Sequence, residues 1–280
     1  MGKLARSWEL VKASWAVLQA DKELLIFPIM STIAVITVMA TFAVPMFLAG
    51  MFDRGFGLGG TLPFAGIVLG FCFYTVQYTI IFYCNSALVG AAMIRLKGGD
   101  PTIGDGFCIA NKHFASILGY ALLSATVGIV LRNIARRGFI GRIVASVLGL
   151  GWNLATFLAV PVLVIEGVGP IEAVKRSSQL LKKTWGEQIA GNLGIGAAFT
   201  LLFFAMLVPF GAALALAIMS KSAVLIVAVV AVFVLAAIVM SLVGSALSAI
   251  YTAAVYRYAT EGDPGGMFDA ELVRGAFRVK

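Results

Sequence analysis

Six long stretches without a charged residue decide what this chain can fold into. A helix needs about 20 apolar residues to cross the roughly 30 Å of hydrocarbon in a bilayer, and each stretch can supply them. Backbone groups in lipid must pair within their own segment, so helices are the expected form. The uncharged stretches are Leu24–Phe52, Gly55–Ile94, Phe114–Leu131, Ile143–Ile165, Gln188–Ser220 and Ser222–Tyr256.

The composition indicates the same class of protein. Only 12% of the 280 residues are charged and 61% are hydrophobic, whereas a soluble domain has about 25% charged residues. The alternating segments of a membrane β-barrel are missing from the sequence. We predict an all-α integral membrane protein, a single transmembrane domain over 1–260. Its six transmembrane helices are expected at about 24–50, 63–94, 114–132, 143–166, 188–219 and 222–256.

The distribution of basic residues predicts the topology. Fifteen Lys and Arg residues lie in the two terminal segments and in the second and fourth loops, and six lie in the other loops. The positive-inside rule therefore places both termini in the cytoplasm, with the protein in the cytoplasmic membrane. We expect no signal peptide, because about twenty amphipathic residues precede the first apolar stretch. The net charge of +8 fits attraction to anionic lipids and does not require nucleic acid.

Four arginines between 132 and 142 depart from this distribution, because they lie on the outer side. They flank Phe139 and Ile140. We predict either a short helix at the outer interface, whose guanidinium groups meet lipid phosphates, or a solvated loop.

Three amphipathic segments, at about 3–20, 103–113 and 170–186, are predicted to be interfacial helices. In the third, apolar and aromatic residues recur at steps of three and four, which is typical of a helix lying in the headgroup region. These residues are Ile171, Val174, Ser178, Leu181 and Trp185.

The first and third of these segments resemble each other. Arg6, Ser7, Leu10, Lys12 and Trp15 match Arg176, Ser177, Leu180, Lys182 and Trp185 at identical spacing. A weaker third copy surrounds Phe107 and Phe114. The pattern predicts three parallel repeats, each an amphipathic helix followed by a transmembrane hairpin. Convergent use of Trp and Lys by interfacial helices is the alternative.

The interior of the spans is polar only through neutral residues. No Asp, Glu, Lys or Arg lies in the middle of a span, although proton relays and ion-coupled carriers generally need such groups there. Gln77, Asn85, Asn153 and Asn192 either line a path for a neutral solute or lipid, or form interhelical hydrogen bonds, which we favour. A stripe of small residues in the last span is expected to pack the helices into one bundle, with oligomerisation as the alternative; its members are Ser241, Gly244, Ser245, Ser248 and Thr252.

No catalytic, cofactor-binding or metal site is predicted. His113 is the only histidine, and Cys72, Cys84 and Cys108 are scattered. Motifs of hydrolases, zinc proteases and nucleotide-binding loops are missing from the sequence. Glu166 is expected to form an interfacial salt bridge with Arg176 or Lys175, or else to contact a headgroup or partner.

The cytoplasmic tail, 261–280, begins with a helix break at Asp263-Pro-Gly-Gly. Asp269 is expected to cap a short helix. We favour packing of this tail against the bundle over binding of another protein.

Several segments resemble a known family of prokaryotic multi-spanning membrane proteins, DUF6159. They are RSWELVKASWAVLQADKELLIFP (6–28), PVLVIEGVGPIEAVKRS (161–177), YRYATEG (256–262) and FDAELVRGAF (268–277). The resemblance implies an integral membrane fold without an assigned activity. The E-x-x-G-P-x-E-A-x-x-R-S core is also similar to membrane domains found beside glycerophosphodiester phosphodiesterases, which implies architecture rather than chemistry.

The sequence thus favours a non-enzymatic scaffold or accessory protein acting at the cytoplasmic face. It would work through contact with anionic lipids, through recruitment of a protein partner, or as a homo-oligomer. The candidate contact residues are Arg6, Lys12, Trp15, Glu166, Arg176, Lys182 and Trp185. The alternative is a passive channel or carrier for a neutral solute or lipid.

Overall fold

The computed structural model describes residues 3–48, 63–185 and 194–274, and all regular secondary structure in them is helical. Six helical segments are long and apolar enough to cross a bilayer, so the chain is an all-α, multi-pass membrane protein. They are formed by α2 (Ile26–Leu48), α3 (Pro63–Leu96), α5 (Phe114–Ala135), α6 (Gly138–Ala155) with its continuation α7 (Ala159–Ile165), α9 (Gly194–Met219) and α10 (Ala223–Glu261).

Short helices precede each pair of long ones. The three predicted amphipathic segments form α1 (Lys3–Ala20), α4 (Ile103–Lys112) and α8 (Pro170–Trp185). Within the two best-matched segments, Leu10 and Leu180 are both buried and Lys12 and Lys182 are both exposed. The order of one short helix and two long helices therefore recurs three times. A repeat in the three-dimensional arrangement stays a prediction.

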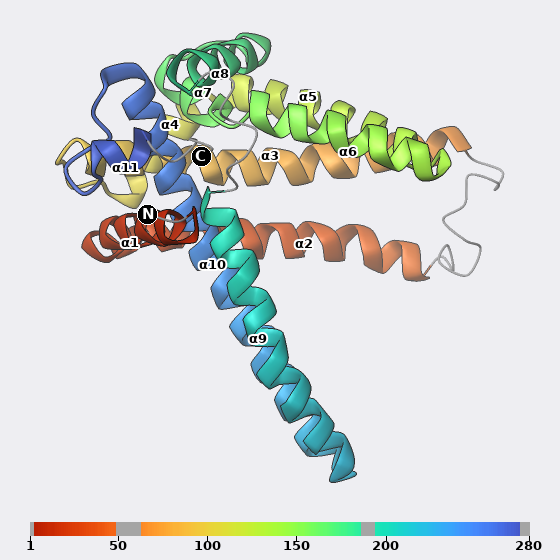
Figure 1. The fold of residues 1–280 in the computed structure, drawn as a ribbon. Helices are drawn as coiled ribbons and strands as arrows, with labels where there is room; N and C mark the ends of the chain where they lie inside the picture. Colours follow the sequence, from red (N-terminus) through yellow and green to blue (C-terminus); the bar gives the residue numbers. More distant parts are fainter. Residues whose placement is uncertain (1–2, 49–62, 186–193, 275–280) are drawn as a thin grey trace.

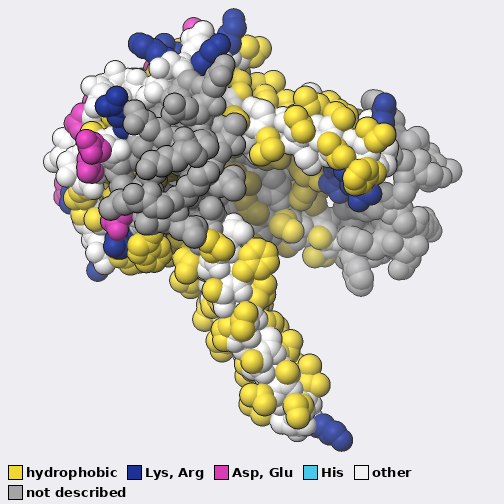
Figure 2. Space-filling view, in the orientation of Figure 1, with side chains coloured by type: hydrophobic (Ala, Val, Ile, Leu, Met, Phe, Trp, Pro, Cys, Tyr) yellow, Lys and Arg dark blue, Asp and Glu magenta, His cyan; other side chains and the backbone are white. Residues whose placement is uncertain are grey.

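The long helices divide into two groups, which contradicts the expected single bundle. Helices α2, α3, α5 and α6 run side by side, while α9 and α10 form a separate hairpin that leaves them at an angle (Figure 1). We call this hairpin the arm. We call the region where it diverges from α2 and α3 the fork. The visible surface of the arm shows many hydrophobic side chains, and the charged side chain seen on it is a basic one at its tip (Figure 2). Such a surface is stable in hydrocarbon and not in water.

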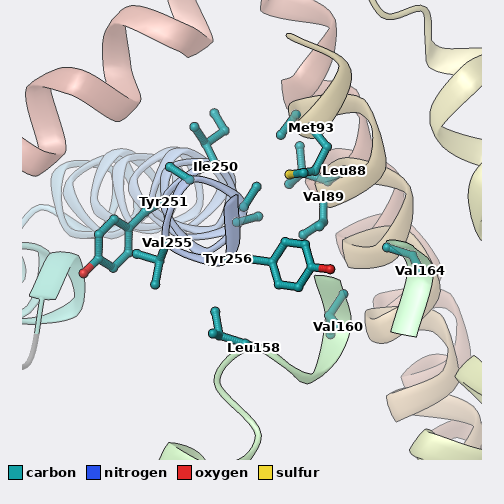
Figure 3. Close-up of a cluster of buried hydrophobic side chains, with 14 of the residues drawn as sticks. Leu88, Val89, Met93, Leu158, Val160, Val164, Ile250, Tyr251, Val255 and Tyr256 are labelled. Carbon is teal, nitrogen blue, oxygen red and sulfur yellow. The ribbon is translucent and has the colours of Figure 1, made fainter. Parts of the chain in front are cut away.

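The buried core lies at the other end of the molecule, which we call the cap (residues 8–28, 86–113, 157–184 and 246–274). Most of its buried side chains come from α1, α3, α7, α8 and α10, and a few come from α2, α4, α5 and α11 (Ala270–Arg274). In Figure 3, α10 passes between its neighbours with Tyr251 and Tyr256 on opposite sides. Because α10 has 39 residues, it is about 58 Å long, nearly twice the hydrocarbon thickness. Its C-terminal part therefore belongs to the cap.

The helices lose their protein cover beyond the cap. Ile33 in α2, Val147 in α6, Val208 in α9 and Val232 in α10 expose 61–73% of their surface. In a bilayer these side chains face lipid, and their exposure carries no cost there.

The predicted fourth span is not one helix. It is broken at Thr156–Leu158, between α6 and α7. Pro161 lies in the first turn of α7, where its missing N–H is tolerated; within a continuous helix its ring would clash with the carbonyl of Phe157.

The segment 132–142 forms neither a separate short helix nor a long loop, and contact of its arginines with lipid phosphates stays a prediction. Helix α5 continues to Ala135 and α6 begins at Gly138, so only Arg136 and Arg137 lie between them. Gly138 has φ +90°, a conformation that glycine adopts without strain and that permits this tight turn. Arg132, in the last turn of α5, donates a hydrogen bond to the Tyr74 hydroxyl.

The described part of the tail packs back on the protein. Helix α10 ends at Glu261, and Gly262 with φ +78° caps it. The N–H of Glu271 donates to Asp269 Oδ1 at 2.9 Å at the start of α11 (Ala270–Arg274). Phe268 and Val273 are both buried in the cap.

Candidate functional site

Helix α1 presents a row of large side chains on the outer surface of the cap. Trp8, Lys12 and Trp15 follow one another at steps of four and three, so they share one face. Trp8 is 46% exposed and Trp15 is 42% exposed. Lys12 pairs with Glu9, with 3.0 Å between Nζ and Oε1. The opposite face is fixed in the cap, with Leu10 and Ser14 among its buried members. Of the predicted contact residues in α1, the Arg6 side chain lies outside the described atoms.

Helix α8 is also anchored along one face. The buried hydroxyl of Ser177 accepts a hydrogen bond of 2.9 Å from the N–H of Leu158, just before α7. Ala173, Leu180 and Leu181 are buried beside it, whereas three lysines of α8, Lys175, Lys182 and Lys183, are exposed. The side chain of Trp185 lies outside the described atoms. Helix α8 thus offers a basic outer face on a rigid base.

Glu166 and Arg176 are brought together. Arg176 Nε lies 3.2 Å from Glu166 Oε2, and the Tyr256 hydroxyl donates to Glu166 Oε1 at 3.2 Å. This arrangement joins α7, α8 and α10. The predicted salt bridge of Glu166 is present, with Arg176 as the partner. Both side chains help to hold these helices together.

A second polar cluster, around Arg257, was not predicted from the sequence. Arg257 is 13% exposed in its side chain and pairs with Glu261 and Asp263, each at 3.0 Å. It also donates to the carbonyl of Leu96 at the end of α3. The spacing of Arg257 and Glu261 is that of a helical ion pair, so that part was visible in the sequence. The bond to Leu96 joins residues too distant in the chain to be foreseen.

The neutral intramembrane residues are not gathered in one place. Gln77 Nε2 donates to the carbonyl of Val35 in α2, at 3.4 Å, as expected of an interhelical hydrogen bond. Asn153 is exposed on α6. Asn85 lines a cavity, and Asn192 lies outside the described residues.

The cavity beside Asn85 lies at the fork. It has a volume of about 210 Å³ and is formed by α2, α3 and α10. Its polar lining consists of Ser31, Cys84, Asn85, Ser245, Ser248 and Thr252. A larger cavity of about 480 Å³ lies between α9 and α10, and Ser248 lines both. The stripe of small residues, expected to pack helices, therefore borders open space along much of its length.

Burial shifts the pKa values of Asp21 and His113, which both lie in the cap. Burial raises the pKa of Asp21 above its ordinary value of 3.8. The N–H of Glu23 donates a hydrogen bond to Asp21 Oδ1, which opposes this shift, whereas the buried Oδ2 has no partner among the described residues. Burial, with Lys112 as a smaller cause, lowers the pKa of His113. Within the described segments, no three His, Cys, Asp or Glu side chains are grouped as metal ligands.

Comparison with known proteins places the chain in a family. No curated protein and no solved structure matches it. A family model described as a family of unknown function, DUF6159, matches residues 64–266. The match extends from the start of α3 to the polypeptide that follows α10, and so includes most of the cap and the α3 and α10 parts of the fork, but not α2. Because it covers most of the chain, this membrane protein belongs to the DUF6159 family.

Proposed function

We propose that this protein is a non-enzymatic membrane protein that acts through contact with anionic lipids at its cytoplasmic face. The observation that carries the proposal is the exposed row of Trp8, Lys12 and Trp15 on a helix whose opposite face is held in the cap. Trp side chains favour the headgroup level of a bilayer, and a lysine beside them can reach the phosphates.

The outer face of α8 supports the same function. Lys175, Lys182 and Lys183 are exposed, and each basic residue near an anionic surface contributes about 1 kcal/mol of attraction. The positive-inside rule assigns α1 and α8 to the cytoplasmic side. Since both helices are fixed by buried contacts, binding orders few additional side chains, which keeps its entropic cost low.

Quenching of tryptophan fluorescence tests the proposal directly. The protein is reconstituted in nanodiscs that contain either brominated phosphatidylglycerol or brominated phosphatidylcholine. Comparison with a Trp8→Phe/Trp15→Phe variant isolates the emission of these two residues. We expect stronger quenching by the anionic lipid, and a smaller difference between the lipids in Lys12→Gln.

The same measurement separates lipid contact from recruitment of another copy. Equal quenching by the two lipids contradicts the proposal. Little quenching by either lipid, together with emission that changes as two copies are placed in one nanodisc, indicates a protein contact instead. A channel for a neutral solute has less support, because the two cavities described above include only Asn85 among Gln77, Asn85 and Asn153.

A further inference from the structure

We propose that the fork is a binding site for a lipid with an uncharged, hydrogen-bonding headgroup, such as a diacylglycerol. This site is separate from the headgroup contact of α1 and involves a different class of lipid. It lies where α10 crosses α2 and α3, at the boundary between the cap and the lipid-exposed helices (Figure 1).

The depth of the cavity suits a headgroup drawn slightly into the bilayer. Asn85 lies eleven residues before Leu96, the end of α3, which corresponds to about 16 Å along the helix. Ile81, which also lines the cavity, is 40% exposed. The cavity therefore opens toward the surface that faces lipid and not toward the core of the cap.

The lining of the cavity is polar but carries no ionised group. Asn85, Ser245, Ser248 and Thr252 offer amide and hydroxyl groups, and Lys, Arg, Asp and Glu are missing from the described lining. Burying a charged phosphate without a counter-charge is costly, so the site disfavours phospholipid headgroups. Hydroxyl and ester groups need only neutral donors and acceptors.

Several of these polar groups have no hydrogen-bond partner among the described residues. Within the described residues, the side chains of Asn85, Ser245 and Ser248 form no hydrogen bond with another group. In contrast, the Thr252 hydroxyl donates to the carbonyl of Ser248. Unsatisfied polar groups next to hydrocarbon cost free energy. A bound hydroxylated headgroup supplies the missing donors and acceptors.

The neighbouring cavity between α9 and α10 can hold the apolar part of the same lipid. It shares Ser248 with the fork cavity and is lined mainly by apolar groups, including Phe199, Phe203 and Met240. The 210 Å³ of the fork cavity holds about seven groups the size of a water molecule. A small headgroup fits there while part of an acyl chain follows the groove between α9 and α10.

Photocrosslinking in nanodiscs tests this site. Two probes carry the same diazirine-labelled acyl chain, one on a diacylglycerol and one on a phosphatidylglycerol, and labelled peptides are identified by mass spectrometry. We expect the diacylglycerol probe to label residues 240–252 preferentially and unlabelled diacylglycerol to reduce that labelling. Equal labelling by the two probes, or no competition, overturns the proposal without requiring any variant.

Matched variants test the role of the unpartnered amide. Asn85→Leu should weaken the labelling of 240–252 by roughly three- to tenfold, the effect of losing a neutral hydrogen bond or two. Asn153→Leu makes the same substitution at an exposed position of α6 that does not line the fork cavity. It should leave the labelling of 240–252 unchanged. Unchanged labelling in a folded Asn85→Leu protein contradicts the site. The quenching of Trp8 and Trp15 should not differ in Asn85→Leu, so the two proposals succeed or fail separately.

Discussion

Single polar side chains in the cap show most clearly what periodicity misses. Ser177 belongs to the segment whose resemblance to 6–15 predicted a repeat, yet its hydroxyl holds the backbone of Leu158 in a fully buried position. Helical spacing identifies the face of a residue but not its partner nineteen positions away. A salt bridge of Glu166 was foreseeable, because Arg176 carries the opposite charge only ten residues later in the chain.

The buried hydroxyl of Ser177 predicts a loss of stability in Ser177→Ala. The variant leaves the N–H of Leu158 without its acceptor, which should lower the free energy of unfolding by about 1–3 kcal/mol. Each kcal/mol corresponds to a decrease in Tm of roughly 2–4 °C. Ser178→Ala is the matched control, because the Ser178 hydroxyl bonds only the local carbonyl of Lys175. Thermal unfolding in detergent measures both. Equal Tm values for the two variants would show that the Leu158 bond contributes nothing.

The raised pKa of Asp21 predicts a particular dependence of stability on pH. A carboxyl group whose pKa is higher in the folded state binds more protons folded than unfolded. It therefore costs stability as pH rises above the ordinary value of 3.8. Asp21→Asn keeps an oxygen acceptor for the N–H of Glu23 and removes this titration. The Tm of the natural protein should fall relative to Asp21→Asn as pH rises above about 4, and a constant difference from pH 3.5 to pH 7 would contradict the assignment.

At the level of elements, uncharged length predicted the six spans, and helical periodicity predicted α1, α4 and α8. The ends of the long helices were less predictable. The apolar residues of α10 near Ile250, buried in the cap, resemble those near Val232, which face outward. Hydrophobicity does not distinguish a protein environment from lipid, because both exclude water. The extension of α3 and α10 into the cap was therefore not visible.

Close packing of α4 on α3 predicts an effect of glycine substitution. A Cβ added at Gly106 would lie 2.5 Å from Phe27 Cζ and 2.8 Å from the carbonyl oxygen of Ala87. Gly106→Ala should therefore move α4 away from α3 and lower the Tm, at a cost typical of overpacking, about 1–3 kcal/mol. Gly104→Ala, in the same helix, meets only Thr102 Oγ1 at 3.6 Å and should be neutral or slightly stabilising. A Tm for Gly106→Ala equal to that of Gly104→Ala would contradict this packing.

The whole molecule combines a protein-packed cap with two sets of lipid-facing helices that diverge from it (Figures 1 and 2). The fork depends on the direction in which α10 leaves the cap, and this follows from buried contacts among segments far apart in the chain, such as those of Ile250 and Tyr256 (Figure 3). The stripe of small residues in α10 could be recognised in the sequence, but the helices that surround it could not. Their role in the cavities became visible only through the arrangement of three helices.

The side of the membrane on which the cap and the arm tip lie is the most direct test of this account. In a protein with Cys72→Ser, Cys84→Ala and Cys108→Ser, single cysteines are introduced by Lys182→Cys in α8 and Lys221→Cys at the turn between α9 and α10. A membrane-impermeant maleimide is added to intact cells and to inside-out vesicles. The account predicts labelling of position 221 only in intact cells and of position 182 only in inside-out vesicles. Labelling of both positions from the same side would show that the arm does not cross the bilayer.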